Sequence, residues 1–212
     1  MRVIIELFTV AVMSAIVVLG FPQRPAWLNV LLALCGLGLL LLNRRFTTTV
    51  IWRRFPVAYD VRDRLVRSVL TSAVFTLLGL AAMACFAAWR NHSVPPVDRT
   101  VLLVLPLYLG WGLLQQYLFQ FFLLGRFLVL VPAPLAVGAT AAAFALVHAP
   151  RPFTACVTLV AGCVWCHLYV RYRVLWPLAV SHALLGAALF HWVYGQNLLA
   201  RWWPGFGLPE AG

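Results

Sequence analysis

Long runs of hydrophobic residues dominate the chain, and most polar residues stand in the stretches between them. A helix needs about 20 apolar residues to cross a bilayer core that is about 30 Å thick. Strands of a membrane barrel would be shorter and would alternate in polarity, so these continuous runs predict helices. We therefore expect an all-α fold, a polytopic transmembrane helix bundle of about seven spans. The runs fall at residues 3–20, 27–42, 69–89, 101–124, 133–149, 154–170 and 174–194.

The amino-acid composition also indicates that most of the chain lies in a membrane. The 212 residues are 64% hydrophobic and only 10% charged, whereas soluble domains are about 25% charged. The net charge of +11 comes from arginine, because the chain has no lysine. A basic balance can indicate nucleic-acid binding, but these arginines follow the predicted connections between spans. We therefore expect membrane lipids as partners and no nucleic acid.

The arginines also predict the orientation of the spans. The connection at 43–68 holds seven of them, and positively charged connections stay in the cytoplasm. Two spans precede that connection, so the N-terminus is expected inside as well. Counting onward, a further inward connection is predicted near Arg126, which follows the run at 101–124. Glu6, near the inner end of the first helix, is interpreted as an interfacial residue.

Polar chemistry divides the chain into three parts. Residues 1–100 hold N-terminal transmembrane helices and the basic cytoplasmic loop, with few polar groups inside the helices. Residues 101–194 carry glutamine, histidine and serine within the predicted spans, and residues 195–212 form a C-terminal tail. Chemistry, if the protein has any, is therefore expected in residues 101–194.

Three glutamines stand in the fourth predicted helix, at Gln115, Gln116 and Gln120. Amides inside hydrocarbon are costly without partners, so such residues usually face the interior of a bundle. Gln116 and Gln120 are four residues apart and share a helix face, while Gln115 lies about 100° around the axis. The spacing predicts an interior amide cluster on this helix.

Two histidines lie at compatible depths on later helices. A turn near Pro132 places Gln116 and His148 sixteen residues away on either side, so each lies about 24 Å from that turn. His182, on the seventh helix, reaches a depth within about 5 Å of theirs. We predict that Gln116, His148 and His182 converge on one buried pocket. The competing interpretation is that these groups only pack the bundle through hydrogen bonds.

These residues resemble the CPBP family of intramembrane proteases, which includes the Ras-converting CAAX endopeptidases and the bacterial relatives called Abi proteins. The family pattern is Glu-Glu-x-x-x-Arg on one helix, Phe-x-x-x-His on the next and His-x-x-x-Asn two helices later. Phe144 and His148 match the second motif, and His182 matches the third. The resemblance covers about residues 101–190 and agrees in order and spacing.

The resemblance implies a chemistry and exposes two departures from it. In the family a glutamate activates water, helped by the histidines, and an asparagine supports the oxyanion. This chain has the three glutamines in place of the charged motif, and Gly186 in place of asparagine. An amide cannot accept a proton near neutral pH, so Gln115 or Gln116 cannot act as a general base.

Two functions therefore follow from the resemblance. The first is an intramembrane endopeptidase in which His148 or His182 acts as base, while Gln115, Gln116 and Gln120 orient water and the substrate carbonyl. The second is a catalytically inactive family member, acting as a membrane binding or scaffold protein. Either implies a membrane-associated peptide or protein partner and no cofactor, in a bacterial inner (plasma) membrane.

A haem or a metal site is the remaining alternative. Cys163, Cys166 and His167 have the spacing of c-type haem attachment. They lie within a predicted helix near its inner end, whereas attachment requires an accessible outer position, so packing explains them better. A metal held by His148 and His182 would lack a third strong ligand.

Overall fold

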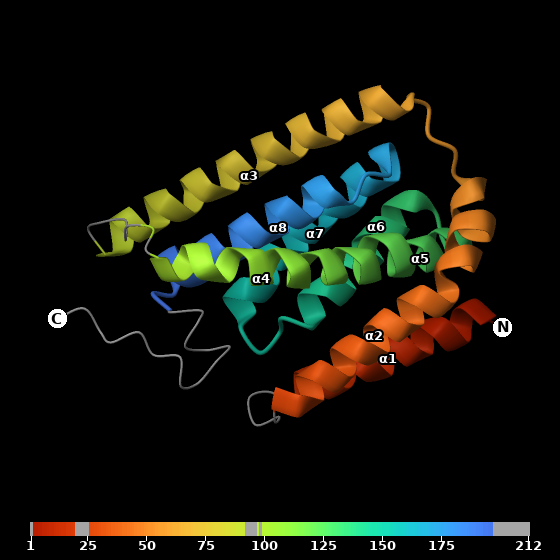
Figure 1. Ribbon diagram of the computed structural model, residues 1–212, viewed down its shortest axis with the longest axis horizontal. Coiled ribbons are helices and arrows are strands. Elements are labelled where there is room, and N and C mark those ends of the chain that lie inside the picture. The colour runs from red at the N-terminus through yellow and green to blue at the C-terminus, as the bar shows by residue number, and fades with distance from the viewer. Residues whose placement is uncertain (1, 20–25, 92–96, 98, 197–212) are drawn as a thin grey trace. The chain divides into compact units, whose positions relative to one another are not determined.

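Figure 1 shows the computed structural model of the chain, which describes residues 2–19, 26–91, 97 and 99–196. The described residues are largely helical and include no strand, which confirms the all-α class. The tail beyond Gln196 lies outside them. The elements are α1 (Arg2–Leu19), α2 (Ala26–Phe46), η1 (Thr47–Ile51), η2 (Trp52–Arg54), α3 (Val61–Asn91), α4 (Arg99–Gln116), η3 (Tyr117–Leu123), α5 (Leu124–Leu130), α6 (Ala133–Leu146), α7 (Pro152–Tyr172), α8 (Trp176–Ala188) and η4 (Leu189–Val193).

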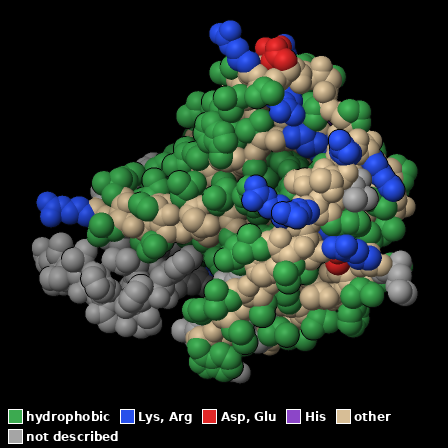
Figure 2. All heavy atoms as spheres, turned by 45° about the vertical axis from the view of Figure 1, so that its right-hand side comes forward, with side chains coloured by type: hydrophobic (Ala, Val, Ile, Leu, Met, Phe, Trp, Pro, Cys, Tyr) green, Lys and Arg blue, Asp and Glu red, His purple; other side chains and the backbone are tan. Residues whose placement is uncertain are grey.

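Four stretches of the described chain are long and apolar enough to cross a membrane, as judged by length and composition. They are Val61–Arg90, Val101–Leu130, Pro152–Tyr172 and Trp176–Val193. The helix at Ala133–Leu146 is apolar but shorter. Hydrophobic side chains cover much of the surface visible in Figure 2, as lipid contact requires. The protein is therefore an integral membrane protein, and the full set of about seven spans stays a prediction.

The connection predicted at 43–68 is shorter than expected. Helix α2 continues to Phe46, and α3 already begins at Val61. The side chain of Asp60 accepts a hydrogen bond from the backbone N–H of Asp63 at 2.7 Å, which caps the first turn of α3. The arginines in the first turns of α3 end the apolar run but not the helix. Hydrophobicity alone therefore places the start of α3 too late in the chain.

The fourth predicted helix is longer than expected. The run at 101–124 continues through the π-helical turn η3 into α5, and the helix ends at Leu130. The prediction that Arg126 lies in an inward connection is therefore wrong: Arg126 is fully buried in α5. Its charge is tolerated there because it pairs with Glu6, as described below. The predicted turn near Pro132 is confirmed.

Contacts divide the chain into two compact units, which are described separately. The first comprises Met1–Arg64 and Gln116–Leu175, and the second comprises Leu65–Gln115 and Trp176–Gly212. In the first unit α6 and α7 pack closely at Gly162. A Cβ built there would lie only 3.2 Å from Ala141, so glycine allows this approach. Small residues at such a contact let helix backbones approach. The turn η3 packs on both of these helices.

Candidate functional site

The amide cluster sits at a π-helical turn. Gln116 ends α4, and Gln120 lies within η3, where backbone hydrogen bonds skip one residue more than in an α-helix. Both side chains are 1% exposed, as expected for amides in hydrocarbon, while Gln115 is half-buried. Turns of this kind are rare and occur often at functional sites. The sequence indicated the amides but not the widened turn that carries them.

Gln120 reaches across the first unit to α7. Its Nε2 donates to the Sγ of Cys166 at 3.6 Å, and sulfur is a weak acceptor. Its Oε1 is buried and has no hydrogen-bond partner among the described residues. Leaving a buried acceptor unsatisfied costs about 1–3 kcal/mol. The amide is therefore positioned to accept a hydrogen bond from a further donor.

His148 stands in the turn after α6, where one ring nitrogen is fixed. Its Nδ1 lies 2.8 Å from the carbonyl oxygen of Phe144. A carbonyl oxygen can only accept, so Nδ1 carries a proton, and in the neutral imidazole the lone pair is then on Nε2. The imidazole also packs edge-on against the Phe144 ring, with ring centres 4.9 Å apart. The i, i+4 spacing that matched the family motif thus fixes the orientation of the imidazole ring.

Phe144 links this histidine to the amide-bearing turn. Its ring lies edge-on to that of Phe119 in η3, with centres 4.9 Å apart, and 6.0 Å from that of Trp165 in α7. Phe144 itself is 2% exposed. Within the first unit, therefore, His148 is connected to η3 through a buried pair of aromatic rings.

His182 belongs to the second unit and lies beside α4. It is 7% exposed, and a Cβ built at Gly112 would stand 3.6 Å from its Cγ. Gly112 precedes Gln116 by one helical turn on the same helix. Each histidine is therefore tied, within its own unit, to the continuous α4–η3 helix. The convergence of His148, His182 and Gln116 stays a prediction.

Gly186 occupies the position where the family pattern has asparagine. A Cβ built there would lie 2.5 Å from Cε1 of Tyr108, a separation that real Cβ atoms essentially never show. The space that an asparagine side chain would enter is therefore filled by the Tyr108 ring, which is 7% exposed. The sequence showed the missing asparagine but not the aromatic ring that has taken its place.

Glu6 is buried and paired, and its position at the membrane interface stays a prediction. Its Oε1 accepts from Arg2 Nε at 2.8 Å, and its Oε2 accepts from Arg126 Nε at 2.9 Å. Arg126 also donates to Thr47 and lies 3.6 Å above the Phe122 ring. Both oxygens of the Glu6 carboxylate are thus engaged by guanidinium groups. The signal that sequence reasoning missed is an acid within one apolar run and an arginine just after another.

The described residues give little support to the haem and metal alternatives. Cys166 lies inside α7 and is fully buried, so its sulfur is not accessible for attachment of a haem. Within the described ranges, no three side chains of the His, Cys, Asp and Glu types cluster so as to hold a metal ion.

Comparison with known proteins connects these residues to a family. The family model described as Type II CAAX prenyl endopeptidase Rce1-like matches residues 97–188. The matched segment contains the three glutamines, Phe144, both histidines and Gly186. No curated protein and no solved structure matches the chain.

Proposed function

We propose that this protein is an intramembrane endopeptidase, because residues 97–188 match the model of the Rce1-like type II CAAX prenyl endopeptidase family. It cleaves a peptide bond of a membrane-associated peptide or protein. The proposed site residues are the histidines and glutamines that stand at the family's motif positions: His148, His182, Gln115, Gln116 and Gln120.

The observation that carries this proposal is the hydrogen bond between His148 Nδ1 and the Phe144 carbonyl. It fixes the tautomer whose Nε2 can accept a proton, which is the role that the missing glutamate leaves open. In the proposed reaction Nε2 takes a proton from water, and the water oxygen attacks the carbonyl carbon. The C–N bond then breaks, and the imidazolium returns the proton to the departing amine.

The remaining residues supply donors and acceptors around that reaction. Amide N–H groups from the glutamines can donate to the carbonyl oxygen as negative charge develops on it. The buried Oε1 of Gln120 can accept from a substrate N–H. His182, buried beside Gly112, would help to orient the water. In this scheme the amides bind and polarise while the histidine moves the proton.

The proposal includes an orientation in the membrane. The arginines between α2 and α3, and those around Arg171 and Arg173, favour the cytoplasmic side for these connections. We place the N-terminus inside, with about seven spans in a bacterial inner membrane.

A second function is favoured by the tyrosine at the asparagine position. Tyr108 packs against Gly186, so no side chain supports an oxyanion from the asparagine position of the family pattern. The first motif has glutamines and no carboxylate, so the family's usual base is absent as well. A chain so altered could bind a membrane-associated peptide without cleaving it. This would make the protein a binding or scaffold member of the family.

One assay separates the two functions. The purified full chain is reconstituted in phosphatidylcholine vesicles and given a fluorogenic CAAX-type peptide, with and without a prenyl group. We expect His148→Ala to lower kcat/KM by about 10²- to 10⁴-fold. The matched control is His167→Ala, which removes an exposed histidine of α7 and should leave the rate unchanged. Wild-type rates in His148→Ala would contradict the proposal.

The same assay identifies the binding function through Gln116→Glu. This change restores a carboxylate at a family position. If the wild type binds the peptide without cleaving it and Gln116→Glu cleaves, then the protein is a binding member of the family.

A further inference from the structure

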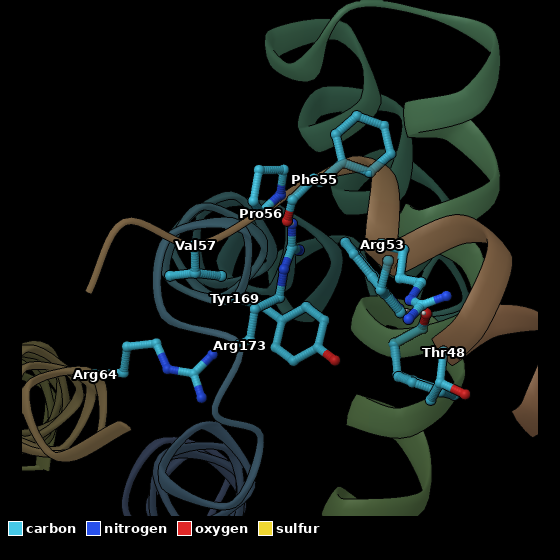
Figure 3. A pocket seen from close by; sticks show the side chains of 10 residues that line it. Thr48, Arg53, Phe55, Pro56, Val57, Arg64, Tyr169 and Arg173 are labelled. Atoms are coloured by element: carbon cyan, nitrogen blue, oxygen red, sulfur yellow. Dashed lines mark hydrogen bonds between the residues drawn. The ribbon is translucent and has the colours of Figure 1, made fainter. Parts of the chain in front are cut away.

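An open pocket of about 350 Å³ lies in the first unit, and neither the three glutamines nor His148 is among its lining residues. Its walls combine aromatic rings with three arginines, Arg53, Arg64 and Arg173 (Figure 3). Its volume is typical of small-ligand sites. The other lining residues are Thr48, Trp52, Phe55, Pro56, Val57, Phe121 and Tyr169.

Arg173 is held at this pocket in an unfavourable backbone conformation. It ends α7 with φ 56° and ψ 31°, and it is the one described residue other than glycine with a positive φ. Glycine is usual at such a position, and another residue there costs about 1 kcal/mol. Its side chain stacks on Trp52 at 3.8 Å and donates from Nη2 to the Phe55 carbonyl at 3.2 Å. The contacts offset the strain and aim the guanidinium at the pocket.

Donor groups of the pocket arginines remain without acceptors. Among the described residues, Arg173 Nε and Nη1 and Arg64 Nε are buried and have no hydrogen-bond partner. No acidic side chain of the described chain forms a salt bridge with the pocket arginines. Guanidinium N–H groups in this state match an oxyanion, which can accept several of them at once.

The positive charges of the half-buried Arg64 and Arg173 also repel each other. Figure 3 shows Arg64 extending from α3 toward Tyr169 and Arg173. Burial, and to a lesser degree the positive charge of Arg64, lowers the pKa of Arg173 to about 10. Arg173 is therefore still a cation at neutral pH, and an anion beside the two guanidinium groups would relieve the repulsion.

The position of the pocket along the spans indicates the source of that anion. The span Pro152–Tyr172 ends one residue before Arg173, and the span Val61–Arg90 begins three residues before Arg64. The pocket thus stands at the end of membrane-crossing segments, where Trp and Tyr side chains occupy the headgroup level. Basic pockets at this depth bind phosphate-bearing lipid headgroups.

We propose that this pocket binds the phosphate of an anionic phospholipid headgroup. Arg64 and Arg173 contact the phosphate oxygens, and exposed Arg53 adds charge at the rim. Phe55, Pro56 and Val57 provide the apolar wall beside the glycerol and acyl part. The site is separate from peptide cleavage and does not require it.

The test measures lipid binding to the full chain in detergent by native mass spectrometry. Short-chain phosphatidylglycerol is titrated against short-chain phosphatidylcholine, and a third arm uses inorganic phosphate. We expect saturable binding of phosphatidylglycerol, weakened about fivefold to tenfold by Arg64→Gln. Arg64 makes no side-chain hydrogen bond to the described residues, so this variant should fold. Arg62→Gln, which removes an exposed arginine two residues earlier, should bind as the wild type does.

Three outcomes would overturn the proposal. Equal binding of the two lipids would show no headgroup site, and equal affinity of Arg64→Gln and Arg62→Gln would exclude this pocket. Competition by inorganic phosphate as strong as that by phosphatidylglycerol would assign the site to the free ion. Arg53→Gln changes a second residue of the pocket wall. A loss of phosphatidylglycerol affinity that is smaller than that in Arg64→Gln would support binding in the same pocket.

Discussion

Two buried polar clusters of the first unit differ in how they are satisfied. The charged cluster, formed by Glu6, Arg126, Arg2 and Thr47, joins α1, α5 and η1 through short hydrogen bonds that use both carboxylate oxygens, although Arg126 Nη2 has no partner among the described residues. The amide at Gln120, by contrast, donates only to a sulfur and has a buried oxygen without a partner in the described part of the chain.

The comparison distinguishes polar groups that hold the fold together, as in the charged cluster, from polar groups that can still bind a ligand, as at Gln120. A buried charge is retained where an opposite charge and further hydrogen bonds compensate its desolvation. A neutral amide is less costly to bury, so it can remain partly unsatisfied in hydrocarbon. In the first unit the buried charges are those of Glu6 and Arg126, whereas Gln116 and Gln120 are buried neutral amides.

The largest effect should come from breaking the charged cluster. Glu6→Gln leaves Arg126 buried and without its carboxylate, so we expect the free energy of unfolding to fall by about 3–5 kcal/mol. Denaturant unfolding in detergent measures this change. Arg2→Gln is the control: its side chain is 53% exposed, and its loss should cost less than about 1 kcal/mol.

A double variant sharpens the interpretation of this cluster. Replacing both partners, by Glu6→Leu with Arg126→Met, should recover most of the stability, because an apolar pair leaves no uncompensated charge. If Glu6→Gln is as stable as the wild type, then the charged cluster is not the structural element described here.

A smaller effect is expected where Tyr108 fills the asparagine position. Gly186→Ala places a Cβ against the ring and should lower the free energy of unfolding by about 1–3 kcal/mol. At Gly110, on α4, a Cβ would meet nothing within 4 Å. Gly110→Ala should therefore stabilise by about 0.5–1 kcal/mol through helix propensity. Both variants are compared by denaturant unfolding. If Gly186→Ala is as stable as Gly110→Ala or more stable, then the Tyr108 ring does not crowd position 186.

The smallest effect on stability should come from the amide itself. Gln120→Leu removes a polar group that is only partly satisfied, so we expect the free energy of unfolding to change by less than about 0.5 kcal/mol. Thr76→Val, which removes a buried hydroxyl bonded to Ser181 at 2.8 Å, should cost about 1 kcal/mol. Peptide cleavage or binding should nevertheless weaken in Gln120→Leu and stay unchanged in Thr76→Val. A cost for Gln120→Leu exceeding that of Thr76→Val would make the amide structural.

Hydrophobic runs and motif spacing predict much of the architecture. The runs at 154–170 and 174–194 correspond to α7 and to α8 with η4, and the turn near Pro132 falls where depth counting requires it. The burial of Gln116 and Gln120 was also predictable, because an amide in a span seeks the interior.

Pairing between distant segments was not predictable from the pattern. The hydrogen bond between Glu6 and Arg126 joins residues 120 positions apart, and each charge in isolation resembles an interfacial residue. The π-helical turn leaves no mark in hydrophobic periodicity. Tyr108 fills the space at Gly186 through tertiary packing, which a missing asparagine does not reveal.

We propose that the hydrogen bond from His148 Nδ1 to the Phe144 carbonyl leaves Nε2 free to act as a base. Nitrogen-15 NMR of histidine-labelled protein in membranes tests it directly, with His148→Ala used to assign the signal. We predict a neutral imidazole protonated at Nδ1 and hydrogen-bonded there, with Nε2 unprotonated. A His148 signal protonated at Nε2 instead would leave no lone pair for water and would contradict the account.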